Sequence, residues 1–304
     1  MEKMKLDRKD GFDRRKFESE EVKSLLSASL SELKNDPLVY PVISQQLKLT
    51  RSEAETYIGA LLDFQEDVHY CASCPGLENC TKPHPHFSLR LDREGGVITR
   101  HYDPCEKMLS LASFQSRYIR CSFPAAWRDD SLKSIERSKS ARNALLLAMS
   151  NSLKGSGQWL WLNGKAGSGK SFMLACYANY LTTKKGPGAF CDTGLLLSEL
   201  KEKSIKDHED FESLMNSLST CSVLVFDDFG NEYKTEYVYT SVLYPLLSAR
   251  DKADLPTCFA SDFSFKQIVS MYQSKIGEER ATQLLELLKR RCVKEYDVTG
   301  IAVH

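Results

Sequence analysis

The chain has 304 residues, and its 41 basic residues balance its 41 acidic residues, so its formal net charge is zero. This balance excludes a global positive field for nucleic acid and leaves only a local patch. The length suggests about two domains. No apolar run is long enough to span a membrane, and the charged N-terminus lacks the apolar core of a signal peptide. We therefore expect a cytoplasmic protein with no membrane partner, whose ten cysteines stay reduced.

Residues 1–117 form the first predicted domain, which we expect to be small and mainly helical. Its charged opening segment, Met1–Ser19, is expected to be poorly ordered. Apolar periodicity then predicts helices over Val22–Leu33, over Val42–Leu47 and from Thr50 to Glu66. The last of these begins with the capping-box pattern T-x-x-E, in which Thr50 and Glu53 satisfy each other's backbone groups.

A window rich in cysteine and histidine follows these helices. Its members are Cys71, Cys74, Cys80, His84, His86, His101 and Cys105, and His69 lies just outside it. The C-x-x-C spacing holds two thiolates on one side of a tetrahedral ion, and a later histidine and cysteine can complete the set. A redox C-x-x-C would need a βαβ setting, which this window lacks. The window predicts a structural Zn²⁺ ion, with more candidate groups than the four places need.

After a predicted linker at 118–130, residues 131–304 alternate between strands and helices. Short apolar runs predict strands over Trp159–Leu162, Ala189–Cys191, Val223–Phe226, Thr257–Ala260 and Val293–Val298. Helical periodicity covers Arg142–Leu153, Gly169–Lys184, Leu195–Lys203, Phe211–Leu218, Tyr237–Ala249, Phe265–Tyr272 and Ala281–Arg291. This alternation predicts an α/β domain with a parallel sheet flanked by helices.

A complete P-loop of the form G-x-x-x-x-G-K-[S/T] follows the first of these strands: Gly164-Lys165-Ala166-Gly167-Ser168-Gly169-Lys170-Ser171. Its glycines let successive backbone N–H groups point at phosphate oxygens, and the following helix adds the positive end of its dipole. Lys170 supplies a charge for the phosphates, and Ser171 offers a hydroxyl to Mg²⁺. The loop therefore predicts binding of a nucleoside triphosphate with Mg²⁺.

Acidic side chains follow two later strands. Asp227 ends a Walker B strand and is predicted to act on Mg²⁺, while Asp228 is the candidate for polarising water and Glu232 is a more distant acid. Asp262 ends the next strand, at the sensor position, where such ATPases place a polar residue beside the γ-phosphate. A carboxylate there repels the phosphate unless it is protonated or faces Mg²⁺.

Two further clusters of residues, one basic and one aromatic, each allow two interpretations. Lys289-Arg290-Arg291 ends the last helix, where it either supplies an arginine finger to a neighbouring subunit or complements the helix dipole. Tyr233, Lys234, Tyr237 and Tyr239 interleave aromatic rings with a cation. Such a cluster either stacks bases of single-stranded DNA or packs within the fold.

Taken together, these motifs resemble those of the primosomal helicase loaders of Gram-positive bacteria, which are DnaC/DnaI-type AAA+ ATPases. The resemblance spans nearly the whole chain and rests on the cysteine–histidine window, on Leu162–Ala175, on Asp227–Glu232 and on Leu255–Ser264. It implies an AAA+ domain and an N-terminal zinc domain that binds the replicative hexameric DNA helicase. It further implies that the protein loads this helicase onto single-stranded DNA, with weak ATP hydrolysis and possible self-assembly.

The resemblance also assigns residues. The implied zinc ligands are Cys71, Cys74, His84 and Cys105, with Cys80 unliganded; the ATP-binding residues are Gly164 to Ser171; and the Walker B acid is Asp227. The finger aligns with Arg290, and Arg291 lies one register away. The family has Asn at the sensor position where this chain has Asp262, which puts the family's hydrolysis rate in doubt.

Two alternatives differ in their requirements. A transposition helper ATPase would share the AAA+ core but would not need the zinc window. An ATP-sensing, zinc-containing regulatory adaptor would bind partners with little turnover, and Asp262 keeps this alternative open.

Overall fold

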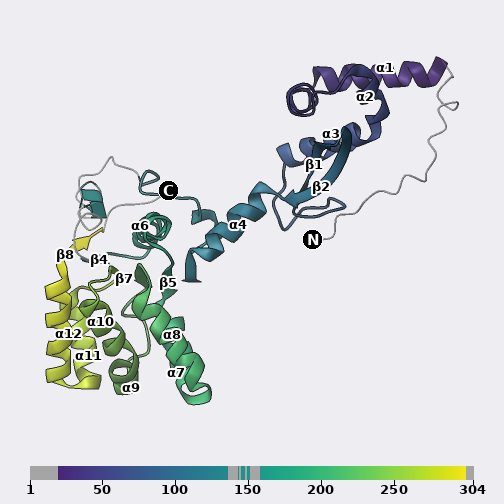
Figure 1. Ribbon diagram of the computed structural model, residues 1–304. Coiled ribbons are helices and arrows are strands. Elements are labelled where there is room, and N and C mark those ends of the chain that lie inside the picture. The colour runs from purple at the N-terminus through teal and green to yellow at the C-terminus, as the bar shows by residue number, and fades with distance from the viewer. Residues whose placement is uncertain (1–19, 136–142, 144, 148, 151–157, 299–304) are drawn as a thin grey trace. The chain divides into compact units, whose positions relative to one another are not determined.

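The computed structural model describes residues 20–135, 143, 145–147, 149–150 and 158–298. Contacts divide the chain into two compact units, residues 1–112 and residues 113–304, which we describe separately (Figure 1). The charged segment Met1–Ser19 and about half of the predicted helix Arg142–Leu153 lie outside the described residues.

The first unit combines helices with a hairpin. Its elements are α1 (Glu20–Asn35), a π-helical turn (Val42–Gln46), α2 (Arg51–Thr56), α3 (Ile58–Ala72), β1 (Phe87–Glu94) and β2 (Val97–Pro104). The predicted capping box begins α2: the Thr50 side chain accepts a hydrogen bond from the Glu53 N–H, and the Glu53 carboxylate accepts one from the Thr50 N–H. The following helix, α4 (Glu106–Ser116), contains the point at which contacts divide the chain.

The β1–β2 hairpin is an addition that was not predicted from the sequence, in a first unit that is otherwise mainly helical as expected. The strands pair antiparallel, with Glu94 opposite Val97, so Gly95 and Gly96 form a two-residue turn. Both glycines have positive φ, 58° and 83°, and a two-residue hairpin turn with positive φ at both positions favours glycine. Buried leucine and isoleucine side chains of the hairpin join the helices in one apolar cluster.

The buried carboxylate of Asp36 connects the end of α1 to α3. Asp36, only 7% exposed, accepts hydrogen bonds from Gln65 and from the half-exposed His69. Burial raises the pKa of Asp36, but the hydrogen bonds from His69, Gln65 and the Leu38 N–H together lower it by more. The pKa of Asp36 therefore lies below its usual value.

The second unit is built on a six-stranded sheet in the order β3-β5-β6-β7-β4-β8, in which every pair of neighbours is parallel. The strands are β3 (Tyr118–Cys121), β4 (Trp159–Asn163), β5 (Gly188–Asp192), β6 (Leu224–Asp227), β7 (Thr257–Ser261) and β8 (Cys292–Asp297). The predicted α/β architecture with a parallel sheet is confirmed. The segment 118–130, expected to be a linker, instead contributes β3 beside β5 and a 3-10 turn, Ala125–Trp127.

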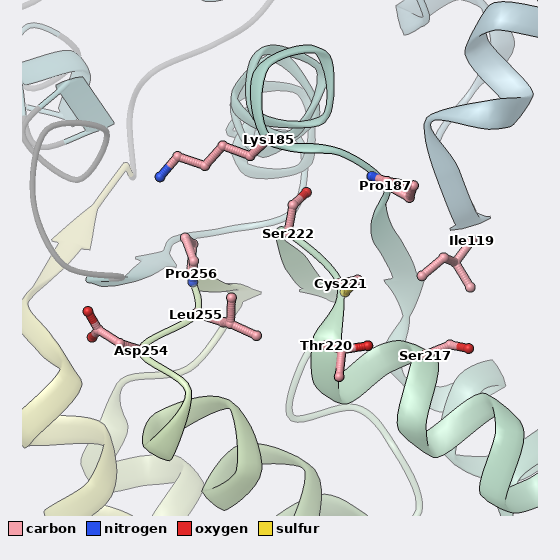
Figure 2. Close-up of a pocket in the computed structure, with 10 residues that line it drawn as sticks. All are labelled: Ile119, Lys185, Pro187, Ser217, Thr220, Cys221, Ser222, Asp254, Leu255 and Pro256. Atoms are coloured by element: carbon pink, nitrogen blue, oxygen red, sulfur yellow. The ribbon is translucent and has the colours of Figure 1, made fainter.

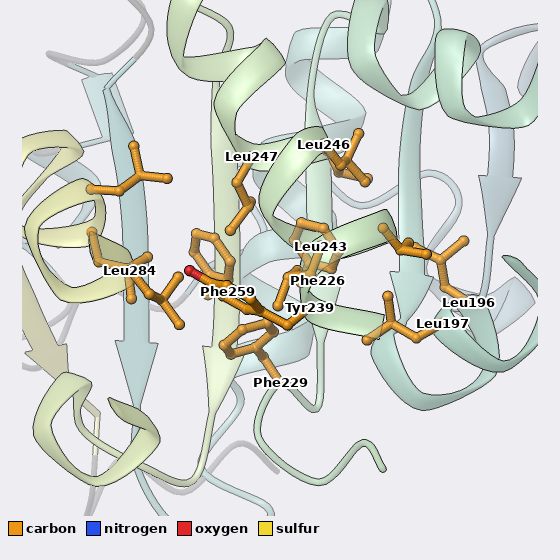
Figure 3. Packing of buried hydrophobic residues seen from close by; sticks show 14 of the residues in the cluster. Leu196, Leu197, Phe226, Phe229, Tyr239, Leu243, Leu246, Leu247, Phe259 and Leu284 are labelled. Atoms are coloured by element: carbon orange, nitrogen blue, oxygen red, sulfur yellow. The ribbon is translucent and has the colours of Figure 1, made fainter. Parts of the chain in front are cut away.

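Helices cover both faces of this sheet. They are α6 (Lys170–Lys185), α7 (Thr193–Lys206), α8 (His208–Thr220), α9 (Glu236–Val238), a π-helical turn (Tyr239–Leu243), α10 (Tyr244–Lys252), α11 (Phe265–Ile276) and α12 (Glu278–Arg291). Along β4, Leu160 and Leu162 pack in the cluster that contains α6, while Trp159 and Trp161 pack in the cluster of the other helices. Figure 3 shows part of the second cluster, with Phe226, Phe259 and Leu243 at close range. Since both faces are buried, the four central strands β4, β5, β6 and β7 are runs of buried residues.

The topology gathers the candidate site at one edge. In parallel strands the carboxyl ends meet at the same edge, and the register places Asn163 beside Ser261 and Asp192 beside Asp227. The P-loop, the Walker B acids and Asp262 therefore follow neighbouring strand ends. Among the described residues, no helix has the length and apolarity needed to cross a membrane.

Candidate nucleotide-binding site

The P-loop runs from the end of β4 into the first turn of α6. Gly169 caps α6 with φ 86°, a conformation that glycine adopts without strain, so the following N–H groups open toward the loop. The Ser168 hydroxyl is buried and has no hydrogen-bond partner within the described chain. A buried donor left unsatisfied is costly, so a phosphate oxygen at this loop fits the residues present.

Lys170 is held by three acceptors. Its Nζ lies 2.7 Å from the Gly164 carbonyl oxygen, 3.1 Å from that of Lys165 and 2.8 Å from Asp262 Oδ1. The lysine is 8% exposed, whereas the Asp262 side chain is 37% exposed. The sensor carboxylate therefore contacts the charge that the P-loop offers to phosphate.

Ser171 and Asp227, the two residues predicted to act on Mg²⁺, are in direct contact. The Ser171 hydroxyl donates to Asp227 Oδ1 at 2.7 Å, and Thr193 donates to the Asp227 backbone carbonyl. Burial raises the pKa of Asp227, and the bond from Ser171 only partly opposes this. A hydroxyl beside a carboxylate is the oxygen donor set that Mg²⁺ prefers beside nucleotide phosphates.

Asp228 and Glu232 differ sharply in their surroundings. Asp228 is exposed, with φ 55°, and its carboxylate accepts from the Asn231 amide at 2.6 Å, so it is accessible to water. Glu232, suggested above as a more distant acid, has a fully buried side chain. Its carboxylate is hydrogen-bonded to the Gly230 N–H and the Tyr272 hydroxyl, so it is inaccessible to solvent and already satisfied within the protein.

The arginines lie at the opposite edge of the sheet. Arg290 contacts Asp251 at 2.5 Å, and Arg291 contacts Asp254 at 2.6 Å and lies over the Trp159 ring. Trp159 begins β4, whose five residues separate it from the P-loop by roughly 13 Å. Within one chain, Arg290 therefore lies far from the phosphate-binding loop, and a finger role requires a second copy.

The tyrosines after Walker B separate into two groups. Tyr239 is 2% exposed and donates to the Arg280 carbonyl, so packing is its role. Tyr233 is 81% exposed, and Tyr237 is 41% exposed with its hydroxyl bonded to Ser204. Only Tyr233 and Tyr237 of this group present ring surface to a ligand.

The predicted zinc ligands are not assembled. Among the described residues, no three His, Cys, Asp or Glu side chains gather as a metal site requires. The Cys71 thiol lies 3.3 Å from the Lys82 ammonium, which is buried against Asp67, and the His84 ring packs at a tilt against the Tyr102 ring. The structure of the described residues therefore gives no support to the predicted zinc site.

A hollow of about 600 Å³ lies elsewhere, at the amino ends of β5, β6 and β7 (Figure 2). Residues just before those strands, Pro187, Ser222 and Pro256, help to line it. The hydroxyls of Thr220 and Ser222 bond to nearby carbonyls of the chain itself. Since the P-loop follows a carboxyl end, this hollow is not the nucleotide site.

Comparison with known proteins adds to this geometry. No protein-family model matches the chain. It is 29% identical over 251 residues to the replicative helicase loader DnaI of Bacillus subtilis (strain 168), and the alignment covers 78% of each protein. The resemblance to the helicase loaders is thereby confirmed. Since residues 113–304 make up a smaller share of the chain, the alignment with DnaI also extends into the first unit.

Solved structures agree on the fold of the larger unit. A crystal structure of DnaI superposes with a TM-score of 0.53 and 24% identity, covering 60% of this chain and 97% of that chain. A candidate primosome component from Streptococcus pyogenes serotype M3 superposes with a TM-score of 0.50 and 23% identity, covering 64% and 98%. At these identities the superpositions support the α/β fold alone.

Proposed function

We propose that this protein is an ATP-binding AAA+ helicase loader that acts in DNA replication. The observation that carries the proposal is the similarity to DnaI, which extends into the first unit and is not confined to the P-loop unit. A transposition helper ATPase would share only the AAA+ core, so this extent favours the loader.

The nucleotide edge supplies the parts that ATP binding needs. Lys170 exchanges its contact with Asp262 for phosphate oxygens, and Ser171 and Asp227 hold Mg²⁺, which neutralises phosphate charge when bound. Asp228, exposed and oriented by Asn231, polarises the attacking water. Arg290 acts on the nucleotide of a second copy, so hydrolysis depends on self-assembly.

The partners follow from the loader role. The first unit binds the replicative hexameric helicase, and the exposed rings of Tyr233 and Tyr237 stack on single-stranded DNA. The finer prediction of zinc held by Cys71, Cys74, His84 and Cys105 rests on the resemblance to the helicase loaders together with the C-x-x-C spacing, and the proposed roles in ATP and helicase binding do not depend on it.

A binding experiment tests this proposal. The full chain is mixed with the replicative helicase of the same organism and followed by size-exclusion chromatography with light scattering, with and without Mg·ATP. We expect a complex with the wild type, and loss of ATP binding in Lys170→Ala because the phosphate contact disappears. Asp227→Asn should keep some ATP binding but lose Mg²⁺-dependent hydrolysis. A folded wild-type chain that never captures the helicase would contradict the loader role, and helicase capture without ATP turnover would favour the adaptor.

A further inference from the structure

Glu232 is a buried carboxylate that the nucleotide chemistry above does not use. Its side chain has no exposed surface, yet it lies only four residues after Asp228. A buried charge is costly unless it is paired and hydrogen-bonded, so its partners indicate what it stabilises.

Three donors converge on this carboxylate. The Gly230 N–H donates to Oε2 at 2.6 Å, the Tyr272 hydroxyl donates to Oε1 at 2.8 Å, and the Lys234 ammonium lies 3.3 Å from Oε1. Lys234 also donates to the carbonyls of Gly230 and Glu232 and lies over the Tyr272 ring. Burial and the Glu232 carboxylate raise the pKa of Tyr272 well above its usual value, so the tyrosine remains a donor.

These bonds fix the backbone directly after Asp228. Gly230 has φ 108°, and a Cβ there would lie 2.5 Å from Ile268 and 2.6 Å from Phe263, so the loop packs closely on α11 and the segment before it. The same loop is tied to β7, because the Ser261 hydroxyl donates to the Phe229 carbonyl at 2.6 Å. Ser261 directly precedes Asp262.

We propose that Glu232 is a positioning residue that, through Tyr272 and the Gly230 N–H, holds Asp228 in register with the sensor residue Asp262. The inference rests on the proposed ATPase function and adds a residue that acts through the loop without touching nucleotide. Loss of this anchor leaves the P-loop intact, because Lys170 and Ser171 contact neither Glu232 nor Tyr272.

Steady-state ATP hydrolysis and equilibrium Mg·ATP binding test the inference on the full chain. Glu232→Gln should lower kcat by about tenfold or more, since small displacements of a catalytic group are costly, while the dissociation constant for Mg·ATP stays within about twofold. Tyr272→Phe, which keeps the ring and deletes one donor, should shift kcat in the same direction by a smaller factor. The matched control is Tyr239→Phe, which deletes a buried hydroxyl bond of similar length to Arg280 and should leave kcat unchanged.

Each outcome has one meaning. Wild-type kcat in both Glu232→Gln and Tyr272→Phe overturns the inference, and so does an equal loss in Tyr239→Phe. If Glu232→Gln does not fold, Tyr272→Phe alone decides. A wild type that binds ATP without measurable turnover also overturns the inference while leaving ATP binding in place, whereas a wild type that binds no ATP overturns the proposed function itself.

Discussion

Replacing the sensor carboxylate Asp262 by Asn should tighten ATP binding. Asp262 Oδ1 lies 2.8 Å from the Lys170 ammonium, which is the charge that we expect phosphate to use. The amide keeps the shape of the side chain, removes the negative charge and can donate a hydrogen bond to an incoming oxygen. Both the lost competition and the lost repulsion act in the same direction.

The magnitude follows from the geometry. A carboxylate and a phosphate that share one ammonium lie about 5–6 Å apart, where like unit charges repel by roughly 3 kcal/mol at an effective dielectric constant of about 20. The Asp262 side chain is 37% exposed, so solvent screens part of this energy. We therefore expect a gain of about 1–2 kcal/mol, or roughly a 5- to 30-fold lower dissociation constant.

Isothermal titration calorimetry with ATP at saturating Mg²⁺ measures the dissociation constant of the wild type and of Asp262→Asn directly. Asp210→Asn is the matched control, because Asp210 also contacts a lysine, Lys203, at 2.8 Å but lies at the start of α8. The control should bind ATP as the wild type does. Unchanged affinity in Asp262→Asn, or the same gain in both variants, would refute the competition between Asp262 and phosphate.

Other predictions concern stability, pH and metal. Arg250 is fully buried and donates hydrogen bonds to the carbonyls of Leu218, Cys221 and Pro256. Arg250→Met removes these hydrogen bonds, so it should lower the free energy of unfolding by about 3 kcal/mol or more in denaturant titrations. A loss under about 1 kcal/mol would contradict this prediction. Because the pKa of Asp36 is lowered in the folded chain, its ionised carboxylate stabilises the first unit at pH values above the ordinary Asp pKa. This stabilisation is lost as the pH falls through the lowered pKa. Unfolding of the full chain across about pH 5 to 3 should therefore be less pH-dependent in Asp36→Asn, and an identical slope would count against it. Elemental analysis should give about one zinc per chain if the four-ligand prediction holds, and a metal-free folded chain that captures the helicase would disprove it.

Much of the larger unit was predictable because its signals are local. A P-loop between an apolar strand and a helix, and an acid at the end of another strand, are typical of parallel sheets with sites at their carboxyl ends. The contact between Ser171 and Asp227 joins residues whose separate roles the sequence already indicated. The contact between Lys170 and Asp262 was not predictable, since it depends on β4 and β7 being neighbours.

The missed features have physical reasons. The β1–β2 hairpin carries a local signal, Gly95-Gly96 between alternating apolar residues, but it lies within the segment whose cysteines and histidines favour a metal site. β3 is a four-residue edge strand with one buried residue, so its sequence lacks the apolar run that marks the central strands. The structural role of Glu232 arises from Tyr272, forty residues away, and no local pattern reports it.

The most direct test of the proposed loader function is a helicase-loading assay. The replicative helicase of the same organism is incubated with circular single-stranded DNA, Mg·ATP and the full chain, and the helicase bound to the circles is quantified after gel filtration. The wild type should raise the amount of loaded helicase several-fold over helicase alone, and Lys170→Ala should not. Equal loading with and without the protein, in a preparation that binds both ATP and the helicase, would contradict the proposed loader function.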